Sequence, residues 1–454
     1  MIISNEILLL HPPGWSLNYG SPHIALPLIK SYLEKNAIQC TIKDLNIEYS
    51  IHMDIAIKEK NIVKFQKKFN SHKAYELYFN KLDTLNTIAK KNDGIFSIKS
   101  GFNFNNCSLS SSADIKKFSK KTSPFTKFYQ SNLIPFVKKM EPSIIGISAT
   151  VPSQLLSSFE IFRILRKDGY DGLLVLGGNT VTRLYNSLYQ QWIFKIIDAI
   201  ILNQGEEALE KLWHSIQSKR DFENIPNLMW RGNDKIHYIG YKKLNQNNFS
   251  MPNFIGYPIG EYWGINYLPA ISARGCYYGK CSFCSIPYSW GNNGFIGYDN
   301  PLSVINFMKD SSQHWGINKF SFVEETMSPK ILTEVSKQII KNKLRFKFEG
   351  YLRLEKTFLD IKILQLIAEA GLKKAFVGIE LISSKNRSNF NKNDNGHLII
   401  EYLKKFYDNN IKVHLFVMIG FPGTTKDDAY ETVNFLLKYE KYIDAVDISH
   451  FLYS

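Results

Sequence analysis

Short apolar runs alternate with helical patterns in two long stretches of the chain, and this alternation limits the fold more than any other sequence feature. The second stretch contains six such runs: Tyr267–Ile271, Phe320–Val323, Phe346–Tyr351, Ala375–Glu380, Val413–Ile419 and Ala445–His450. Strands that alternate with helices form parallel sheets whose faces the helices cover. The sequence therefore predicts an α/β fold whose ligands bind where the strands end.

The first stretch predicts a separate sheet. Its apolar runs are Glu6–Leu10, Cys40–Asp44, Ser143–Ser148, Leu173–Leu176 and Ala199–Leu202. Continuous runs of this kind are typical of strands buried on both faces of a parallel, doubly wound sheet. Small and turn-forming residues follow the runs, where they admit a ligand to the backbone or simply form βα turns. They are Pro12, Ser148, Thr150, Gly177, Gly178, Gly205 and Glu206.

The alternation also predicts the domain boundaries. Residues 1–216 form the first α/β domain, interrupted at about 50–140 by a lysine-rich, partly mobile helical insertion. Residues 217–264 are expected to be a β-rich connector, and residues 265–454 form the second domain.

Composition restricts the class of protein. The chain has 454 residues, of which 44% are hydrophobic, enough for two or three domains with cores of their own. Its apolar runs are shorter than the roughly 18–20 residues that span a bilayer, and the N-terminus lacks the basic region of a signal peptide. We therefore expect a cytoplasmic protein without a membrane span. The net charge of +15 comes from lysines spread over the whole chain, which argues against a nucleic-acid partner.

Three of the five cysteines lie within nine residues: Cys276, Cys281 and Cys284. A structural zinc is normally closed by four ligands, but Cys40 and Cys107 are far upstream and His314 has no zinc-like spacing. Three thiolates favour an iron–sulfur cluster that leaves one iron open for substrate or cofactor. A distorted zinc knuckle, or three reduced surface thiols, is the alternative.

The segment Arg274–Cys284 resembles the cluster loop of radical S-adenosylmethionine (radical SAM) enzymes, especially those with an N-terminal cobalamin-binding domain. The resemblance implies that the three cysteines hold a 4Fe-4S cluster whose fourth iron chelates SAM, and that reductive cleavage yields a 5'-deoxyadenosyl radical. This loop is one residue longer than the usual family spacing. The resemblance further implies a partial (β/α)6 radical SAM barrel for residues 265–454 and a Rossmann-like cobalamin-binding domain for residues 1–216.

The resemblance also implies roles for individual residues. It places Phe283 beside the SAM adenine, Glu324 and Glu325 at the SAM amino group, Arg353 at the SAM carboxylate or another acid, and Glu380 at the ribose. A Val-Glu-Glu sequence replaces the common Gly-Gly-Glu here, and a plain surface salt bridge is the alternative for each charged position. The turn-forming residues of the first sheet would contact cobalamin. No Asp-x-His-x-x-Gly segment is present, and His11 is not in that context, so we expect no axial histidine.

The implied function is a radical SAM enzyme that uses cobalamin to methylate an unactivated carbon. Such an enzyme needs a reductant, such as flavodoxin or ferredoxin, and a small-molecule or peptide substrate. A radical SAM cyclisation, rearrangement or epimerisation without methyl transfer is the alternative. A truncated, non-catalytic scaffold is another, because relatives usually continue beyond the position of Phe451–Ser454.

Overall fold

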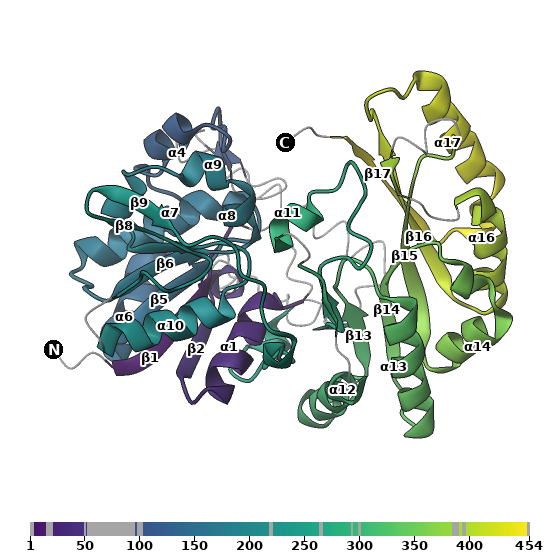
Figure 1. Cartoon of the computed structure of the whole chain (residues 1–454), viewed down its shortest axis with the longest axis horizontal. Coiled ribbons are helices and arrows are strands. Elements are labelled where there is room, and N and C mark those ends of the chain that lie inside the picture. The colour runs from purple at the N-terminus through teal and green to yellow at the C-terminus, as the bar shows by residue number, and fades with distance from the viewer. Residues whose placement is uncertain are drawn as a thin grey trace. The chain divides into compact units, whose positions relative to one another are not determined.

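The computed structural model consists of two units, Met1–Ile265 and Asn266–Ser454 (Figure 1). It describes residues 4–14, 21–49, 51, 96–97, 103–217, 221–262, 267–291, 294–297, 301–383, 390–392 and 396–451. Each unit is built around one main sheet.

The first unit contains a seven-stranded sheet in the order β2-β1-β5-β6-β7-β8-β9. Its strands are β1 (Ser4–His11), β2 (Gln39–Asp44), β5 (Pro142–Ser148), β6 (Leu173–Gly177), β7 (Ala199–Ile201), β8 (Leu228–Gly232) and β9 (Lys235–Tyr238). The first five strands in that order are parallel, and β8 and β9 are antiparallel additions. Because β2 and β5 lie on opposite sides of β1, the sheet is doubly wound, as predicted.

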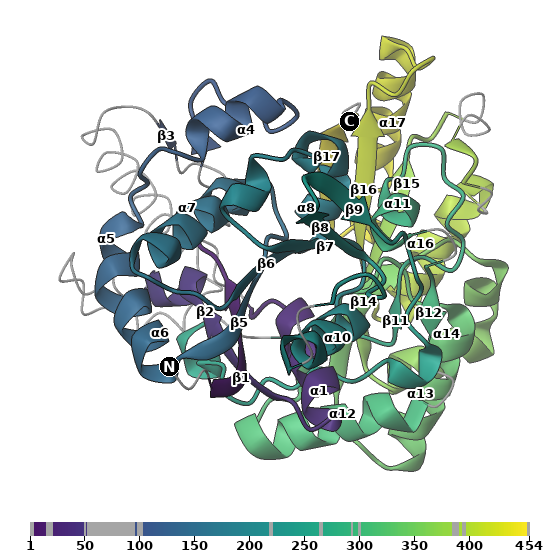
Figure 2. The same cartoon turned by 60° about the vertical axis from the view of Figure 1, so that its left-hand side comes forward.

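Helices cover both faces of this sheet. Helices α1 (Ala25–Lys35) and α10 (Glu206–Gln217) contact each other on one face, and α6 (Ile134–Met140) and α7 (Ser153–Lys167) lie over the other (Figure 2). Leu8 and Leu10 of β1 belong to the same core cluster as Phe159 and Phe162 of α7. Burial on both faces explains why the strands are continuous apolar runs.

The predicted insertion lies partly outside the described residues, which omit 52–95 and 98–102. Its described remainder includes β3 (Phe96–Ser97), β4 (Asn103–Phe104), α4 (Ser112–Phe118) and α5 (Thr126–Phe128). Phe118 and Phe128 are buried in the core cluster of the first unit. The described part of the insertion therefore contributes to the core. Two short helices, α8 (Asn179–Arg183) and α9 (Tyr185–Leu188), follow β6.

The second unit contains six parallel strands in sequential order, as the alternation predicts. They are β10 (Leu268–Ala270), β13 (Lys319–Phe322), β14 (Lys347–Leu352), β15 (Leu372–Glu380), β16 (Lys412–Ile419) and β17 (Ala445–His450). The helices that follow the strands are α12 (Pro301–Trp315), α13 (Pro329–Lys341), α14 (Ile361–Glu369), α16 (Ile399–Asp408) and α17 (Lys426–Lys438). With β10 and β17 as separate edges, the sheet is an open (β/α)6 barrel, and the predicted fold class is confirmed.

One glycine shows how the sequence ends a helix in this barrel. Gly371 follows α14 with a φ of +112°, and a Cβ there would lie 2.1 Å from the carbonyl oxygen of Phe346. Only glycine fits this position, and the helix ends there.

A small antiparallel ladder of β11 (Ala273–Arg274) and β12 (Ile296–Gly297) flanks the cysteine loop, and α11 (Ile286–Trp290) follows that loop. Among the described residues, none of the helices combines the length and the apolar character that a membrane crossing requires.

Candidate functional site

The cysteine loop runs from the end of β11 to the start of α11, next to the carboxyl end of β10. Cys276, Cys281 and Cys284 are free thiols that are partly buried. Gly279 has a φ of +60°, which lets the chain turn between the first two cysteines, and the Cys284 amide donates to the Cys281 carbonyl at 3.2 Å. The loop therefore gathers its three sulfur atoms into one region.

The three thiols affect one another electrostatically. Burial raises the pKa of Cys281 to about 11, with Lys392 and Arg353 acting in the opposite direction and Cys276 and Cys284 adding to the rise. Burial also raises the pKa of Cys284. Binding of iron would release these protons, because thiolates are the ligands.

The donor set fits a cluster better than a single ion. Among the described residues, no three His, Cys, Asp or Glu side chains converge on one metal position. A cubane spreads its three cysteine ligands over different irons, so it does not require such convergence. The zinc-knuckle alternative therefore has no complete ligand set in the described part of the chain.

Two adjacent glutamates follow β13 and lie in different environments. Glu324 is buried, and its Oε1 accepts hydrogen bonds from the hydroxyl and the amide of Ser272. Its Oε2 is buried without a hydrogen-bond partner in the described structure. Burial raises the pKa of Glu324 to about 7 despite the bonds from Ser272. Glu325 is less buried and accepts a 2.5 Å hydrogen bond from Trp290 Nε1.

Arg353 directly follows β14, and its guanidinium is held from several directions. Nε donates to Glu355 at 3.1 Å, and Nη2 donates to the carbonyl of Lys392 at 2.6 Å. Nη1 lies 4.0 Å from the Sγ of Cys281, and the guanidinium carbon lies 3.8 Å from the centroid of the Tyr278 ring. The structure thus places Arg353 against the cysteine loop and pairs it with a carboxylate of the protein.

Glu380 ends β15 with a φ of +59°, which is uncommon for a residue with a side chain. Its carboxylate forms a 2.8 Å ion pair with Lys392, and the two side chains are only 11% and 10% exposed. Lys392 Nζ also donates to the carbonyl of Gly378. The predicted ribose ligand is therefore part of a buried ion pair.

Residues 390–392 were not singled out by the sequence, yet they bind the cysteine loop at several points. The Ser282 amide donates to the Phe390 carbonyl at 3.0 Å, and the Asn391 side chain donates to the Lys280 carbonyl at 2.8 Å. The Tyr278 hydroxyl donates to the Asn391 carbonyl at 2.5 Å. Most of these bonds use backbone atoms, so no motif marks them in the sequence.

Phe283 lies beside a small apolar cluster at the same end of the barrel. It packs edge-to-face on Phe390, with ring centroids 5.8 Å apart, and near Leu381 and Met418. Phe421, which lies just after β16, contacts Phe390 from another side. An aromatic surface of this kind suits a flat adenine ring.

The predicted cobalamin residues lie at the carboxyl edge of the first sheet, but Gln154 of α7 organises that edge. Gln154 is fully buried, and its Oε1 accepts bonds from the amides of Thr150 and Val151 at 2.8 and 3.2 Å. Its Nε2 lies 2.8 Å from the Pro12 carbonyl and 3.0 Å from Nε2 of His11. Because Oε1 accepts two amide bonds, Nε2 is the donor toward His11. Sequence reasoning missed Gln154, which looks like any polar residue in a helix.

The glycines of this edge differ in whether the surrounding backbone leaves room for a side chain. Gly178 has a φ of +106°, and a Cβ there would lie 2.3 Å from the Ala149 carbonyl oxygen, so it is required for the approach of two loops. Gly205 would accept a Cβ, because that atom would meet its nearest neighbour at 3.7 Å, an ordinary van der Waals distance. Of the other predicted residues at this edge, Ser148 and Glu206 are buried and Gly177 is partly exposed.

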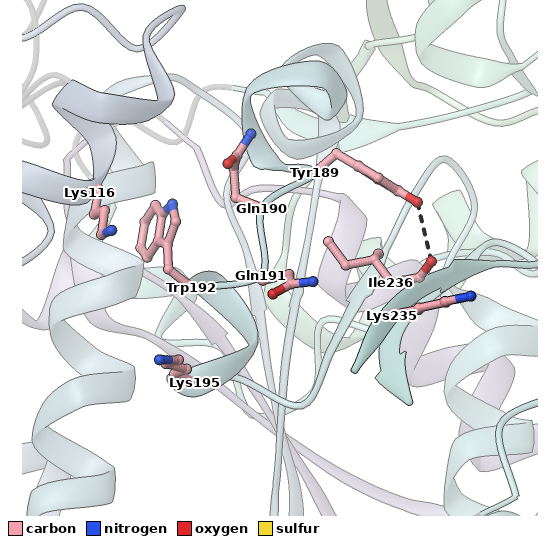
Figure 3. A pocket seen from close by; sticks show the side chains of 8 residues that line it. All are labelled: Lys116, Tyr189, Gln190, Gln191, Trp192, Lys195, Lys235 and Ile236. Carbon is pink, nitrogen blue, oxygen red and sulfur yellow. Dashed lines mark hydrogen bonds between the residues drawn. The ribbon is translucent and has the colours of Figure 1, made fainter. Parts of the chain in front are cut away.

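A surface depression of about 710 Å³ lies elsewhere in the first unit, between α4, the segment after α9, and β9 (Figure 3). It is lined by Lys116, Tyr189, Gln190, Gln191, Trp192, Lys195, Lys235 and Ile236. The residues predicted from the sequence to bind cofactors are absent from this lining.

Comparison with known families gives a match to the radical SAM superfamily over residues 271–436. This range covers the cysteine loop and the described strands from β13 to β16. The resemblance inferred from the cysteine loop is confirmed, and these residues form a radical SAM domain.

Two curated proteins are similar over about two thirds of the chain. An uncharacterized methyltransferase of Pyrococcus horikoshii is 23% identical over 68% of this chain and 67% of its own length. The anaerobic magnesium-protoporphyrin IX monomethyl ester cyclase of Rubrivivax gelatinosus is 24% identical over 65% of this chain and 54% of its own length.

Solved structures share the fold over almost the whole chain. The radical SAM methyltransferase TsrM from Kitasatospora setae, solved with tryptophan and a SAM analogue, has a TM-score of 0.64 and 14% identity. The match covers 98% of this chain and 73% of TsrM. The cobalamin-dependent radical SAM enzyme OxsB, solved with aqua-cobalamin, has a TM-score of 0.66 and 13% identity over 95% of this chain. This chain spans about half of OxsB, at 52% of its length.

Proposed function

We propose that this chain, which contains a radical SAM domain and has the fold of cobalamin-dependent radical SAM enzymes, is a cobalamin-dependent radical SAM methyltransferase. Cys276, Cys281 and Cys284 hold a 4Fe-4S cluster, and the residues at the strand ends around them bind SAM. When bound, the cluster supplies the electron that cleaves SAM, and cobalamin carries the methyl group to an unactivated carbon. The observation that carries the proposal is the single loop at the barrel mouth that holds three partly buried free thiols, Cys276, Cys281 and Cys284.

The carboxylates near the thiols support SAM binding. Glu324 has a buried Oε2 without a partner in the described structure, and an ammonium group would satisfy it. Glu325 is the more accessible of the two glutamates and lies within electrostatic reach of Cys284. Glu324 and Glu325 therefore bind and orient the SAM amino group beside the cluster. The ring of Phe283 packs against the adenine. Glu380 binds the ribose, and SAM therefore competes with Lys392 for the Glu380 carboxylate.

The edge of the first sheet supports a cobalamin site without a histidine ligand. His11 accepts a hydrogen bond from Gln154 at Nε2, and burial lowers the pKa of His11 to about 4. His11 is therefore neutral at pH 7, and its Nε2 lone pair already has a donor. The residues that would contact the corrin are those at the strand ends: Pro12, Ser148, Thr150, Gly177, Gly178, Gly205 and Glu206.

One incubation tests the proposal. Protein purified and reconstituted anaerobically with iron and sulfide is incubated with SAM, hydroxocobalamin, a reductant and a candidate substrate, and the products are measured by mass spectrometry. A methyltransferase of this type yields both 5'-deoxyadenosine and S-adenosylhomocysteine. Reconstituted protein that binds no iron, or cleaves no SAM under strong reductant, contradicts the radical SAM assignment. The triple variant with serine at all three cysteines is the control.

A reaction without methyl transfer is the second candidate, because one of the similar proteins is a cyclase. The same incubation separates the two. Formation of 5'-deoxyadenosine without S-adenosylhomocysteine would favour cyclisation, rearrangement or epimerisation. A flavodoxin or ferredoxin is the proposed electron donor in either case, and the substrate is a small molecule or a peptide.

A further inference from the structure

Two cationic side chains are gathered at one of the three cysteines. Arg353 Nη1 lies 4.0 Å from Cys281 Sγ, and Nη2 of the same guanidinium donates to the backbone carbonyl of Lys392. Their charges act on the Cys281 thiol, whereas Cys284 is exposed to the carboxylates of Glu325 and Glu380. The cysteine trio therefore has one corner that faces positive charge.

We infer that Arg353 and Lys392 are positioning residues that stabilise the reduced state of the cluster from its Cys281 corner. The inference rests on the proposed function, because it requires that the three cysteines hold the cluster. It gives Arg353 a different role from the SAM-carboxylate contact expected from the sequence.

The guanidinium is fixed in an orientation that serves this role. Its Nε donates to Glu355 at 3.1 Å, which fixes one edge of the guanidinium. Nη2 is bonded to the Lys392 carbonyl, and Tyr278 lies against its face. Nη1 is thereby directed at the sulfur. A long N–H to sulfur contact is mainly electrostatic, and partial burial keeps solvent from screening it.

Lys392 is fixed as firmly. Its Nζ is bonded to Glu380 and to the Gly378 carbonyl at the end of β15. Its backbone is held because Phe390 and Asn391, the two preceding residues, are bonded to the cysteine loop at Ser282 and Lys280. The two cations therefore move with the cysteine loop, and their distance to the cluster is set by the fold.

The physical consequence concerns one electron. Reduction adds one negative charge to the cluster, and a nearby cation or hydrogen-bond donor to a ligand sulfur favours the more negative state. Removal of either cation must make the reduction potential more negative. A residue that only bound the SAM carboxylate would change the dissociation constant of SAM and leave the potential of the SAM-free cluster unchanged.

The test is a redox titration of reconstituted, SAM-free protein, followed by the EPR signal of the reduced cluster. The variants are Arg353→Gln, Arg353→Lys and Lys392→Gln. The control is Lys374→Gln, which removes a cation that pairs with Asp444 at the opposite end of β15. At the wild-type midpoint, we expect the reduced-to-oxidised ratio to fall severalfold in Arg353→Gln and Lys392→Gln. A tenfold fall corresponds to about 59 mV for one electron. Arg353→Lys, which keeps the charge, should shift less, and Lys374→Gln should not shift.

Each result decides one question. A wild-type protein without an iron–sulfur signal overturns the proposed function itself. If the variants carry the wild-type amount of cluster at the wild-type potential, the inference is wrong and the proposed function stands. If Arg353→Gln assembles no cluster, Arg353→Lys and Lys392→Gln decide by the same titration. A weaker affinity for SAM with an unchanged potential would return Arg353 to the role of a SAM-carboxylate ligand.

Discussion

Lys392 and Glu380 form an ion pair of 2.8 Å at the mouth of the barrel, with about one tenth of each side chain exposed. Glu380 belongs to β15, whereas Lys392 belongs to the segment that holds the cysteine loop. The pair therefore links the last residue of a strand to the region of the proposed cluster. Its burial means that neither charge can be left alone without cost.

Replacement of Lys392 by methionine should destabilise the second unit. Loss of one partner leaves the Glu380 carboxylate buried and unpaired, which typically costs about 3–5 kcal/mol. At about 2–4 °C per kcal/mol for a unit of this size, the melting temperature should fall by roughly 6–20 °C. Differential scanning calorimetry of the cluster-free protein measures this fall in melting temperature. The double variant Lys392→Met/Glu380→Gln should recover most of the loss, and equal melting of the single and double variants would contradict this account.

Stability of the second unit should depend on pH through Glu324. Burial raises its pKa from 4.5 to about 7, so between these values the folded state binds the proton more strongly than the unfolded state. The stabilisation of the folded state by protonated Glu324 is therefore fully present below about pH 4.5 and is lost as the pH rises to about 7. It amounts to about 3 kcal/mol, at 1.36 kcal/mol per pKa unit.

Glu324→Gln removes this dependence, because glutamine keeps the shape and does not ionise. The stability of wild type minus that of Glu324→Gln should fall between pH 5 and pH 8 in denaturant titrations. Glu325→Gln is the comparison variant: burial also raises the pKa of Glu325, but this side chain is less buried, so the corresponding fall should be smaller. A difference that is constant over this pH range would show that Glu324 ionises as readily in the folded protein as in the unfolded chain.

The sequence predicted the strands, because burial on both faces leaves a continuous apolar run in each of them. It also placed Cys276, Cys281 and Cys284 together, since they share one short loop. It could not predict the contacts that connect distant segments. Arg353 meets Cys281, and Lys392 meets Glu380, only because the fold brings separate βα units to one end of the barrel. Such pairs leave no local pattern, and several of their partners are backbone carbonyls.

Gly178 and Gly205 should respond differently to alanine. In Gly178→Ala the new Cβ would lie 2.3 Å from a carbonyl oxygen at a φ of +106°, and backbone strain alone costs about 1–3 kcal/mol. We expect the first unit to melt at a lower temperature. Gly205→Ala meets only ordinary contacts and should change stability by less than about 0.5 kcal/mol. Because Gly205→Ala should keep its stability, the amount of cobalamin that stays bound to it through gel filtration should fall only if the ligand touches this position. An equally stable Gly178→Ala would contradict the requirement for glycine.

Gln154→Leu should disorder the edge at which cobalamin is proposed to bind. The leucine fills a similar volume but leaves the amides of Thr150 and Val151 and the carbonyl of Pro12 without their buried partner. Each unsatisfied group costs about 1–3 kcal/mol unless the loop opens to water.

Opening of the loop is measurable by hydrogen–deuterium exchange, and the amides of Thr150 and Val151 should exchange at least tenfold faster in Gln154→Leu. The control is Ser158→Ala, one turn later on α7, because the Ser158 hydroxyl donates only back to the helix at the Gln154 carbonyl among its bonds in the described structure. Its loss should leave the exchange of both amides unchanged. Cobalamin retention should follow the exchange rates, since a loop that opens to water no longer presents a fixed surface to the corrin. Unchanged exchange in Gln154→Leu would mean that the two loops are held by the sheet itself rather than by this one amide.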